Sequence, residues 1–497
     1  MKLITPRHAL TLLVMLIKTA IISVSVLFLC RRWLFMRVLL GIVELYSAVR
    51  IIASEDSAEY KIPWLVFILL FPAAGCVFYL LFYKRRLSAR ERRALAAIKK
   101  GAPLHEDFPT FTGLYPSGTV RLLVSRASAH VYGDTAVSYF GTGEQMLDAL
   151  ITDISGARKF VFLEFFLIAD GVMWQRVTEA LKECAARGVE VKIIYDDLGC
   201  MRGVPRELCR ARRVCEIEAY PFFRLRSVLN NEFNNRTHRK IAVIDGEKAY
   251  TGGVNMADEY INLKSPFGLW KDAAVRIEGS ATDYLTYLFL SDLSLCTGKR
   301  IDFKRYYRYS KRESRGYVIP YGDTPRPLLC SGVSHALIRS ILSEAREFVY
   351  ITTPYLIPDG EVVAAIENAA ERGVDVRIIT PHVPDKKLVF SLTRSSYARL
   401  LRAGVRIYEF TPGFIHAKLV LSDGECATVG TANLDYRSLA HNLECGVLLM
   451  GHPTISKIRA DVENIISKSK EITDVGRDVG PIWRVLGALM RIFAPLL

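Results

Sequence analysis

The chain shows two patterns of apolar residues, and the first, a set of long apolar runs, lies near the N-terminus. Residues 9–30 form an apolar run whose only charge is Lys18, and residues 62–82 form a run without any charge. Each run is long enough to cross the apolar core of a bilayer, about 30 Å thick, as a helix. Residues 33–53 carry three charges, so they could span the membrane or lie along its surface. We therefore predict a membrane anchor of two or three transmembrane helices over residues 1–83.

The second pattern begins beyond the N-terminal runs, where strand-like and helix-like segments alternate and the same succession occurs twice. The strand-like segments 157–162 and 345–350 share the form Ala-Arg-x-Phe-Val-aromatic, and each leads through a helical stretch to a second strand preceded by Arg-Gly-Val. Strand, helix and strand in this order are typical of a βαβ unit. We predict an α/β fold of two lobes related by a pseudo-twofold axis, residues 110–300 and 317–480, with one shared cleft.

Three segments outside the lobes have patterns of their own. Residues 84–109 begin with a basic run and are predicted to form a juxtamembrane linker. Residues 301–316 mix basic residues with tyrosines, so this linker between the lobes could bind lipid phosphates, bind nucleic acid or be solvated. Apolar residues recur at helical spacing in residues 481–497. This predicts an amphipathic C-terminal helix that lies on a membrane surface or packs on the second lobe.

The net charge of +15 is concentrated at the N-terminus. Residues 1–100 contain 16 Lys and Arg against 5 Asp and Glu, a balance of +11, which leaves +4 for the other 397 residues. Basic residues that flank apolar segments face the cytoplasm and attract anionic lipids. We therefore expect a multi-pass protein of the cell membrane with both lobes on the cytoplasmic side. Anionic membrane lipids are the expected partners, and no nucleic acid is expected.

The cysteines give little support to a metal site. All ten are scattered along the chain, without CxxC spacing or an accompanying histidine cluster. This pattern favours reduced thiols over a zinc site or a disulfide framework. Since a glycine-rich phosphate loop is also missing from the sequence, we predict neither a metal nor a cofactor.

Each predicted lobe contains one copy of the motif His-x-Lys-x4-Asp, which is the candidate chemistry of the chain. The two copies are His238, Lys240 and Asp245, and His416, Lys418 and Asp423. On a strand, a histidine and a lysine two residues apart share one face. A turn of small residues follows each copy, and the candidate supporting residues of these turns are Gly253 and Asn255, and Thr431 and Asn433.

These residue types fit phosphodiester chemistry. One imidazole can attack phosphorus and form a covalent phosphohistidine, while the other protonates the leaving alkoxide and then deprotonates the acceptor alcohol. The two lysines would bind the non-bridging oxygens, a task otherwise given to a metal ion, and the two asparagines would add neutral donors. We therefore expect activity to survive chelation of divalent metals.

The doubled motif resembles that of the phospholipase D superfamily, and the stretches around it are similar to bacterial cardiolipin synthases. These stretches are residues 195–199, 250–255, 353–359, 408–418 and 430–438. The resemblance implies two lobes whose histidines act together, preceded by hydrophobic segments. It also implies transfer of a phosphatidyl group from one phosphatidylglycerol to another, with release of glycerol and without a nucleotide.

Other functions are compatible with the same motifs. A phospholipase D, or a phosphatidyltransferase with another acceptor alcohol, would differ only in the pocket. A membrane-tethered nuclease would use the same chemistry, but the small charge excess of the lobes argues against it. A scaffold with inactive lobes is disfavoured because both motifs are complete. The sequence leaves open which histidine attacks, the acyl preference and the oligomeric state.

The motif aspartates are not expected to contact the histidines. Asp245 and Asp423 each precede a glycine at a hairpin corner, and seven residues along a strand span roughly 20 Å. A nucleophilic imidazole still needs an acceptor on its second nitrogen. Similar members of the superfamily place a carboxylate before a later strand. This resemblance implies two pairs, namely Glu444 with His416 and Asp272 with His238.

Overall fold

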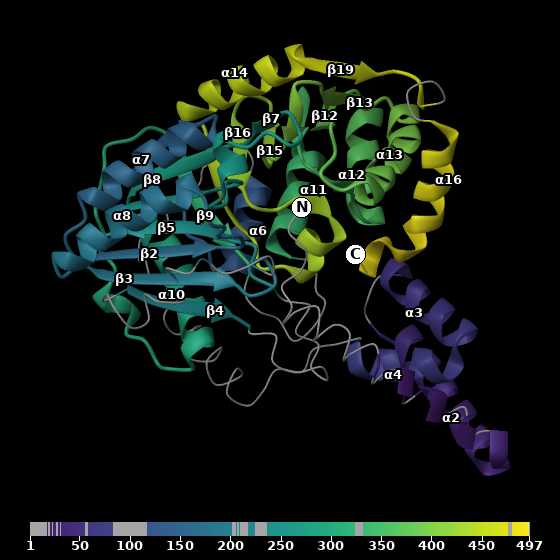
Figure 1. Ribbon diagram of the computed structural model, residues 1–497. Helices are drawn as coiled ribbons and strands as arrows, with labels where there is room; N and C mark the ends of the chain where they lie inside the picture. The colour runs from purple at the N-terminus through teal and green to yellow at the C-terminus, as the bar shows by residue number, and fades with distance from the viewer. Residues whose placement is uncertain are drawn as a thin grey trace.

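The computed structural model describes most of both predicted lobes and part of the N-terminal segment. The described residues are scattered positions between 17 and 29, Pro205, Leu208, and the ranges 31–54, 58–82, 117–200, 217–223, 236–323, 332–475 and 480–496. The predicted membrane run 9–30 lies mostly outside these residues, and the predicted linker 84–109 lies wholly outside them. Figure 1 shows two α/β lobes and a group of N-terminal helices that projects from one of them.

Lobe 1 is built on one mixed sheet. Its elements are α6 (Ser117–Ala127), β1 (Thr135–Phe140), α7 (Gly143–Ser155), β2 (Phe160–Phe165), α8 (Val172–Ala186), β3 (Glu190–Asp196), β4 (Ile217–Phe222), β5 (Lys240–Ile244), β6 (Lys248–Gly252), η1 (Asp258–Ile261), β7 (Leu269–Lys271), β8 (Ala274–Gly279) and α10 (Thr282–Thr297). The strand order is β1-β8-β6-β5-β2-β3-β4, with β2, β3 and β4 parallel. All residues of β2 are buried, as expected for a strand covered on both faces.

Lobe 2 repeats this sheet. Its elements are β9 (Tyr317–Gly322), α11 (Val333–Glu344), β10 (Phe348–Thr352), β11 (Leu356–Ile357), α12 (Gly360–Glu371), β12 (Asp375–Pro381), α13 (Lys387–Arg402), β13 (Arg406–Phe410), β14 (Gly413–Ile415), β15 (Leu419–Ser422), β16 (Cys426–Gly430), β17 (Leu434–Asp435), η3 (Arg437–His441), β18 (Cys445–Met450), α14 (Thr454–Ser467) and β19 (Ser469–Ile472). The order β9-β18-β16-β15-β10-β12-β13 matches lobe 1 strand for strand, and β19 extends it. The predicted α/β repeat is confirmed.

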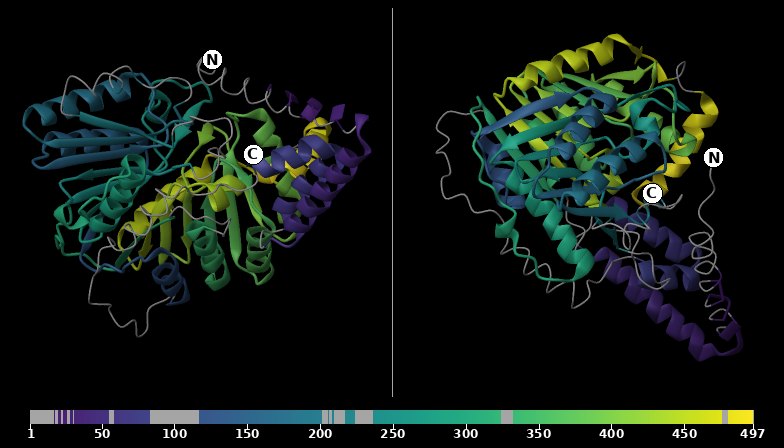
Figure 2. Two further views of the ribbon diagram at one scale, coloured as in Figure 1. Left: turned by 90° about the horizontal axis from the view of Figure 1, so that it is seen from below. Right: turned by 60° about the vertical axis from the view of Figure 1, so that its left-hand side comes forward.

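One hydrophobic core joins the two lobes. Helix α10 is buried along most of its length, and Leu285 and Phe289 belong to the same cluster of buried residues as Val318 and Leu448 of lobe 2. Figure 2 shows the two sheets next to each other from two further directions. Because burial of apolar surface is the main stabilising contribution, this shared core fixes the lobes and holds a site between them.

Residues 62–82 belong to two helices, so the prediction of one spanning helix over this segment is wrong. The N-terminal helices are α2 (Leu34–Ile52), α3 (Ala58–Leu70) and α4 (Pro72–Phe82). Helices α3 and α4 fold back on each other, as shown by the ring centroids of Trp64 and Tyr79, which lie 6.0 Å apart. A Cβ on Gly75 would lie 2.6 Å from the backbone of Ile68, so only glycine permits this approach. No helix in the described part of the chain combines the length and apolarity needed to cross a membrane.

The linker between the lobes packs on lobe 1. Tyr306 and Tyr307 are buried in the shared core, next to η2 (Phe303–Arg305). The backbone N–H groups of Arg308 and Tyr309 donate to the carboxylate of Asp283 at 2.9 and 3.0 Å. Residues 306–309 are therefore part of the folded lobe, whereas a solvated connector was one of the predicted alternatives.

The C-terminal segment packs on lobe 2, which was the second of its two predicted positions. It forms α16 (Pro481–Met490) and η4 (Arg491–Leu496), and α16 lies along α13. A Cβ on Gly487 would lie 2.5 Å from the carbonyl oxygen of Ser391, and Arg491 donates to Ser395. Val485 stays 62% exposed, so one side of the helix still presents apolar surface to solvent.

Candidate active site

The motif aspartates lie at the hairpin corners. Strand β5 turns into β6 at Asp245 and β15 turns into β16 at Asp423, and these residues have positive φ values of 55° and 53°. The carboxylate of Asp245 accepts the backbone N–H groups of residues 158–160, and that of Asp423 accepts those of residues 346–348. Each aspartate therefore fastens its hairpin to the start of the neighbouring strand, β2 or β10.

Each motif histidine is bonded to a carboxylate of the other lobe. Nδ1 of His238 lies 2.9 Å from Oε2 of Glu444, and Nδ1 of His416 lies 2.7 Å from Oδ2 of Asp272. All four side chains are buried. The sequence led to the same four residues but to the opposite pairing, and that expectation is wrong. Because Nδ1 faces the carboxylate in both pairs, Nε2 is the nitrogen available for reaction.

The pairs cross because the lobes exchange short backbone contacts. Strand β14 of lobe 2 pairs in parallel with β7 of lobe 1, and the N–H of His416 donates to the carbonyl oxygen of Lys271 at 2.7 Å. In the same way, the N–H of His238 donates to the carbonyl oxygen of Leu443 at 3.0 Å. Each of these carbonyls belongs to the residue just before a carboxylate. The exchange therefore brings each carboxylate to the histidine of the opposite lobe.

Gly253 and Thr431 occupy equivalent positions beside the two carboxylates. Their backbone N–H groups donate to the carbonyl oxygen of the residue after each carboxylate, in both cases at 2.9 Å. A side chain has no room at Gly253, since a Cβ there would lie 2.0 Å from Oδ1 of Asp272. The hydroxyl of Thr431 donates to Glu444. The shorter side chain, Asp272, therefore lies against the backbone of Gly253, and the longer side chain, Glu444, accepts a hydrogen bond from the hydroxyl of Thr431.

Lys240 and Lys418 are buried beside the histidines. The ammonium group of Lys240 donates to the carbonyl oxygen of His238 at 2.7 Å, and Lys418 makes the equivalent bond to His416. Burial lowers the pKa of Lys240 to about 8 and that of Lys418 to about 7. An anion bound next to them would favour the charged form, so the two ammonium groups suit a phosphate ligand.

Burial also lowers the pKa of both motif histidines, that of His416 to about 3. Burial acts to raise the pKa of Asp272 and Glu444, but the interactions with His416 and His238 outweigh it and the net shift is downward. At neutral pH the resting site therefore holds two neutral imidazoles, each bonded to an ionised carboxylate. A neutral imidazole with its second nitrogen held in this way is a competent nucleophile or base.

Each of the two predicted asparagines donates a hydrogen bond from its side-chain amide to a residue nearby in the sequence. Nδ2 of Asn255 donates to the hydroxyl of Tyr260 at 2.7 Å, and Nδ2 of Asn433 donates to Asp435 at 3.0 Å. Oδ1 of Asn255 accepts the backbone N–H of Leu167. In contrast, the buried Oδ1 of Asn433 has no hydrogen-bond partner among the described residues.

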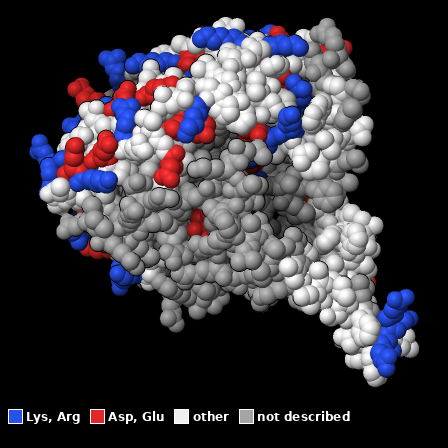
Figure 3. Space-filling model, viewed as in Figure 1, with Lys and Arg blue, Asp and Glu red and all other residues white. Residues whose placement is uncertain are grey.

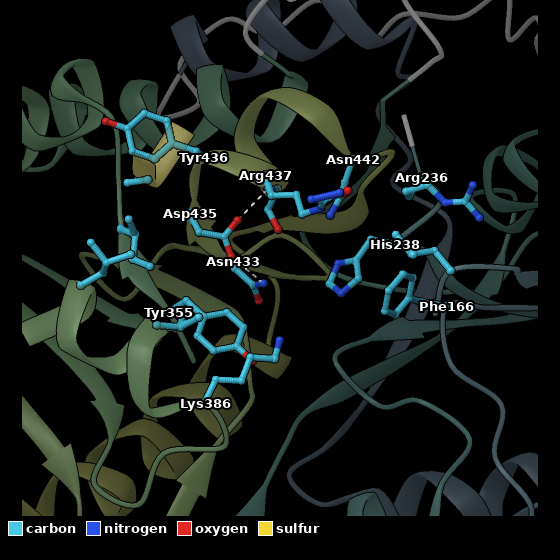
Figure 4. A pocket seen from close by; sticks show the side chains of 16 residues that line it. Phe166, Arg236, His238, Tyr355, Lys386, Asn433, Asp435, Tyr436, Arg437 and Asn442 are labelled. Carbon is cyan, nitrogen blue, oxygen red and sulfur yellow. Dashed lines mark hydrogen bonds between the residues drawn. The ribbon is translucent and has the colours of Figure 1, made fainter. Parts of the chain in front are cut away.

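A pocket of about 170 Å³ opens beside His238. Figure 4 shows Asn433, Asp435 and Arg437 on one side of it, with His238 and Phe166 facing them. The other lining residues are Leu198, Arg236, Tyr355, Ile357, Lys386, Val389, Leu392, Tyr436, Ser438, Asn442 and Ala494. Most of these residues come from lobe 2, and Ala494 comes from the C-terminal segment.

The sequence motifs led to His238 and Asn433 but not to the other polar residues of this pocket. Arg437, Ser438 and Lys386 lie outside the motif hairpins, so the motif spacing carries no information about them. A comparison of the two repeats contains a usable signal, because Arg437 follows Asn433 by four residues and the equivalent position in lobe 1 is Glu259. Such a charge reversal between matching turns singles out Arg437 as a residue that the repeated fold itself does not require.

Within the described residues, no group of three or more His, Cys, Asp or Glu side chains is arranged to hold a metal ion. The cations that follow the motif histidines on the same strands, and that could bind a phosphate, are those of Lys240 and Lys418. This donor set supplies positive charge to non-bridging oxygens directly.

The repeated lobes match a family model described as cardiolipin synthase, PLD-like domain, over residues 150–269 and 338–466. A model of a phospholipase D-nuclease N-terminal region matches residues 43–82, which cover most of α2 and all of α3 and α4.

Relatives cover nearly the whole chain. An uncharacterized protein of Streptococcus mutans is 36% identical over 91% of this chain and 99% of its own length. Cardiolipin synthase 1 of Staphylococcus aureus is 32% identical over 83% of this chain and 86% of its own length. Among solved structures, phosphatidylserine synthase of Haemophilus influenzae shares the fold, with a TM-score of 0.58 at 16% identity over 76% of this chain and 97% of its own.

Proposed function

This chain belongs to the family of the cardiolipin synthase, PLD-like domain, and we propose that it joins two phosphatidylglycerol molecules into cardiolipin and glycerol. The observation that carries the proposal is the crossed pair of buried contacts, His238 with Glu444 and His416 with Asp272. Two oriented imidazoles in one interface, with two buried lysines beside them, supply a nucleophile, an acid and base, and charge for a phosphate.

The proposed reaction has two steps with balanced atoms. In the first, Nε2 of one histidine attacks the phosphorus of a phosphatidylglycerol, and the bond from phosphorus to the glycerol oxygen of the headgroup breaks. The bound phosphate anion favours the imidazolium form of the other histidine, which therefore takes up a proton from solvent when the lipid binds. It passes this proton to the leaving oxygen, so that glycerol leaves and a phosphatidyl-histidine remains. In the second step, the latter histidine takes the proton of a headgroup hydroxyl on a second phosphatidylglycerol. The hydroxyl oxygen attacks phosphorus, the phosphorus–nitrogen bond breaks, and cardiolipin forms.

Each buried side chain has a defined task in this scheme. The carboxylates of Glu444 and Asp272 stabilise the imidazolium that forms on the histidine they contact. Lys240 and Lys418 neutralise the non-bridging oxygens, whose negative charge is greatest in the transition state. Since the site is buried, these charge interactions are stronger than they would be in water.

The N-terminal helices support a location at a membrane. Apolar side chains are highly exposed there, including Leu34 at 76%, Leu69 at 78% and Leu70 at 67%. Such a concentration of exposed apolar surface is rare on a monomer in water. Figure 3 shows this projecting part as largely uncharged, with Lys and Arg at its far end. The proposal therefore places α2, α3 and α4 against lipid, where phosphatidylglycerol is available.

The test is product analysis with the purified full chain and vesicles that contain phosphatidylglycerol. Cardiolipin and glycerol should appear in equal amounts, with EDTA present or absent, and His238→Ala and His416→Ala should serve as inactive controls. Phosphatidic acid as the sole product would instead identify a phospholipase D. Loss of activity in EDTA that one metal ion restores would contradict the metal-free scheme.

A further inference from the structure

The pocket beside His238 contains two buried polar atoms without partners. Oδ1 of Asn433 and Oγ of Ser438 have no hydrogen-bond partner among the described residues, although the side chain of Asn433 is only 6% exposed and Ser438 is 1% exposed. A buried polar atom left unpaired costs free energy, so such atoms in a pocket point to a ligand that pairs with them. An amide oxygen accepts a hydrogen bond and a hydroxyl can both donate and accept, which matches the hydroxyl groups of a polyol.

The same pocket is also cationic on the lobe 2 side. Arg437 and Lys386 line it together with Arg236. The charge of Arg236 is balanced by Asp196, since Nη2 of the guanidinium lies 2.8 Å from Oδ1 of the carboxylate. The carboxylate of Asp435 attracts the second cation, the guanidinium of Arg437. Lys386 lies 4.0 Å from Asp385, a longer contact than that of Arg236 with Asp196, so its ammonium group can still attract an anionic ligand.

Lobe 1 does not repeat this arrangement around His416. The residue equivalent to Arg437 is Glu259, and the imidazole of His416 has the rings of Tyr260 and Trp270 at centroid distances of 5.3 Å each. The backbone of the repeat is therefore the same, but the polar atoms without partners differ. Beside His238 they are acceptors on Asn433 and Ser438, whereas beside His416 the buried atom without a partner among the described residues is the indole Nε1 of Trp270, which can only donate. Among the described residues, the pocket beside His238 therefore suits an anionic, hydroxyl-bearing ligand better than the aromatic surroundings of His416 do.

The far wall of the pocket touches the N-terminal helices. The hydroxyl of Tyr436 donates to Glu59 of α3 at 2.8 Å, and the backbone N–H of Gly360 donates to the same carboxylate at 3.0 Å. Ala494 of the C-terminal segment lines the pocket and packs in one cluster with Tyr60. The pocket therefore lies at the base of the helices that the proposed function places against lipid, within reach of a headgroup.

We infer that this pocket is an acceptor subsite for a phosphoglycerol headgroup, with Arg437 and Lys386 on its phosphate and Asn433 and Ser438 on its glycerol hydroxyls. The inference rests on the proposed function, because it assigns the second lipid of that reaction a place. The phosphate of the acceptor is separated from its reacting hydroxyl by the glycerol carbons, so it needs a site other than Lys240 and Lys418. Recognition of this second anion would favour transfer to a phosphoglycerol over transfer to water or to a neutral alcohol.

The test compares acceptors in Arg437→Gln, Arg437→Lys and the native full chain. Vesicles supply labelled phosphatidylglycerol as donor, and the acceptors are unlabelled phosphatidylglycerol, soluble glycerol 3-phosphate, glycerol and water. We expect Arg437→Gln to lower transfer to both phosphate-bearing acceptors by roughly tenfold or more relative to glycerol and water, the size of one lost charge-assisted hydrogen bond. Arg437→Lys should keep most of the preference. A loss confined to phosphatidylglycerol would show that the site reads the lipid form of the headgroup.

Two outcomes would overturn the inference. One is an equal fall in transfer to all four acceptors by a folded Arg437→Gln protein, and the other is an unchanged acceptor preference. Glu259→Gln is the matched control on lobe 1 and should leave the preference as it is. If Arg437→Gln fails to fold, Ser438→Ala decides the matter, since it should raise the KM for the phosphoglycerol acceptor several-fold more than it changes hydrolysis of the donor. A native chain that makes no cardiolipin at all would instead contradict the proposed function.

Discussion

His238 and His416 occupy equivalent positions in two lobes with the same strand order, but their surroundings differ. The imidazole of His416 is enclosed by aromatic rings, including those of Tyr260 and Trp270. The imidazole of His238 has the ring of Phe166 at a centroid distance of 5.1 Å and opens onto the polar pocket. The strand framework is therefore duplicated, while the chemical environment of each histidine is its own.

The carboxylate contacts show how the repeat keeps one geometry with different residues. Glu444 is one methylene longer than Asp272, and the position beside it changes in step, from Gly253 in lobe 1 to Thr431 in lobe 2. A reaction that needs one nucleophile and one acid and base requires two histidines that are placed alike but titrate and bind differently. If the chain uses the proposed mechanism, the surroundings of each motif, and not the motif itself, set the role of its histidine.

Replacement of either histidine should have the largest effect and should separate their roles. We expect His238→Ala and His416→Ala each to lower turnover by at least about 10⁴-fold, as for removal of a nucleophile or its base. Intact-mass measurements under alkaline conditions should detect a phosphatidyl adduct in one variant only, because the variant that lacks the acid and base still has its nucleophile. Near-normal turnover in either variant would contradict a site shared by both lobes.

Replacement of either carboxylate should have the second largest effect, and it tests whether each histidine is paired with a carboxylate of the other lobe. Glu444→Gln and Asp272→Asn should each lower turnover by about 10² to 10⁴-fold while the fold is kept, since an amide favours the wrong tautomer of the histidine. In nuclear magnetic resonance spectra of the imidazole nitrogens, Glu444→Gln should shift the signals of His238, and Asp272→Asn those of His416. Shifts of the histidine in the same lobe would contradict the crossed pairs.

This crossing could not be predicted from the sequence, although the four residues could. Strand spacing states which residues share a face within one lobe, and it excluded Asp245 and Asp423 from the histidines correctly. The pairing depends on how β7 meets β14 and how Leu443 meets His238, and these contacts join residues far apart in the chain. Local patterns contain no information on that packing.

The prediction of one continuous helix over residues 62–82 went wrong for a related reason. The hydropathy of residues 62–82 is the same for one long helix and for two short helices that fold back. Pro72 begins the second helix and Gly75 allows the close approach of the two helices. A membrane helix also tolerates proline and glycine, so these two residues do not distinguish the hairpin from one long helix. The sequence pattern alone favoured the simpler of two structures.

The lysines provide a smaller effect, visible in the pH profile. Burial lowers the pKa of Lys418 to about 7 and that of Lys240 to about 8, and only the protonated form attracts the phosphate. Binding of the anionic substrate should therefore be complete below pH 7 and should be lost as the pH rises through 7 to 8. In profiles of kcat/KM, which report the free enzyme, Lys418→Arg should move this alkaline limb upward by at least about one pH unit, because arginine stays charged.

The matched variant Lys240→Arg sharpens the comparison between the lobes. Since the pKa of Lys240 lies above that of Lys418, its replacement should move the alkaline limb less. An alkaline limb that ignores both replacements would mean that another group titrates there. An equal shift from both would mean that the two lysines titrate as one unit.

The motif aspartates should have the smallest effect on catalysis, despite their place in the motif. Asp245 and Asp423 each accept three backbone N–H groups at a hairpin corner with positive φ, and neither bonds its histidine. Asparagine tolerates the same backbone conformation, so Asp423→Asn removes the ionised acceptor and little else. Hydrogen bonds to a charged group contribute about 1.5–3 kcal/mol each, and an amide keeps only part of that. We therefore expect Asp245→Asn and Asp423→Asn to lower the thermal midpoint in calorimetry while turnover per folded molecule stays within about threefold of the native value. A turnover that falls a hundredfold at an unchanged midpoint would instead give the aspartates a part in the chemistry.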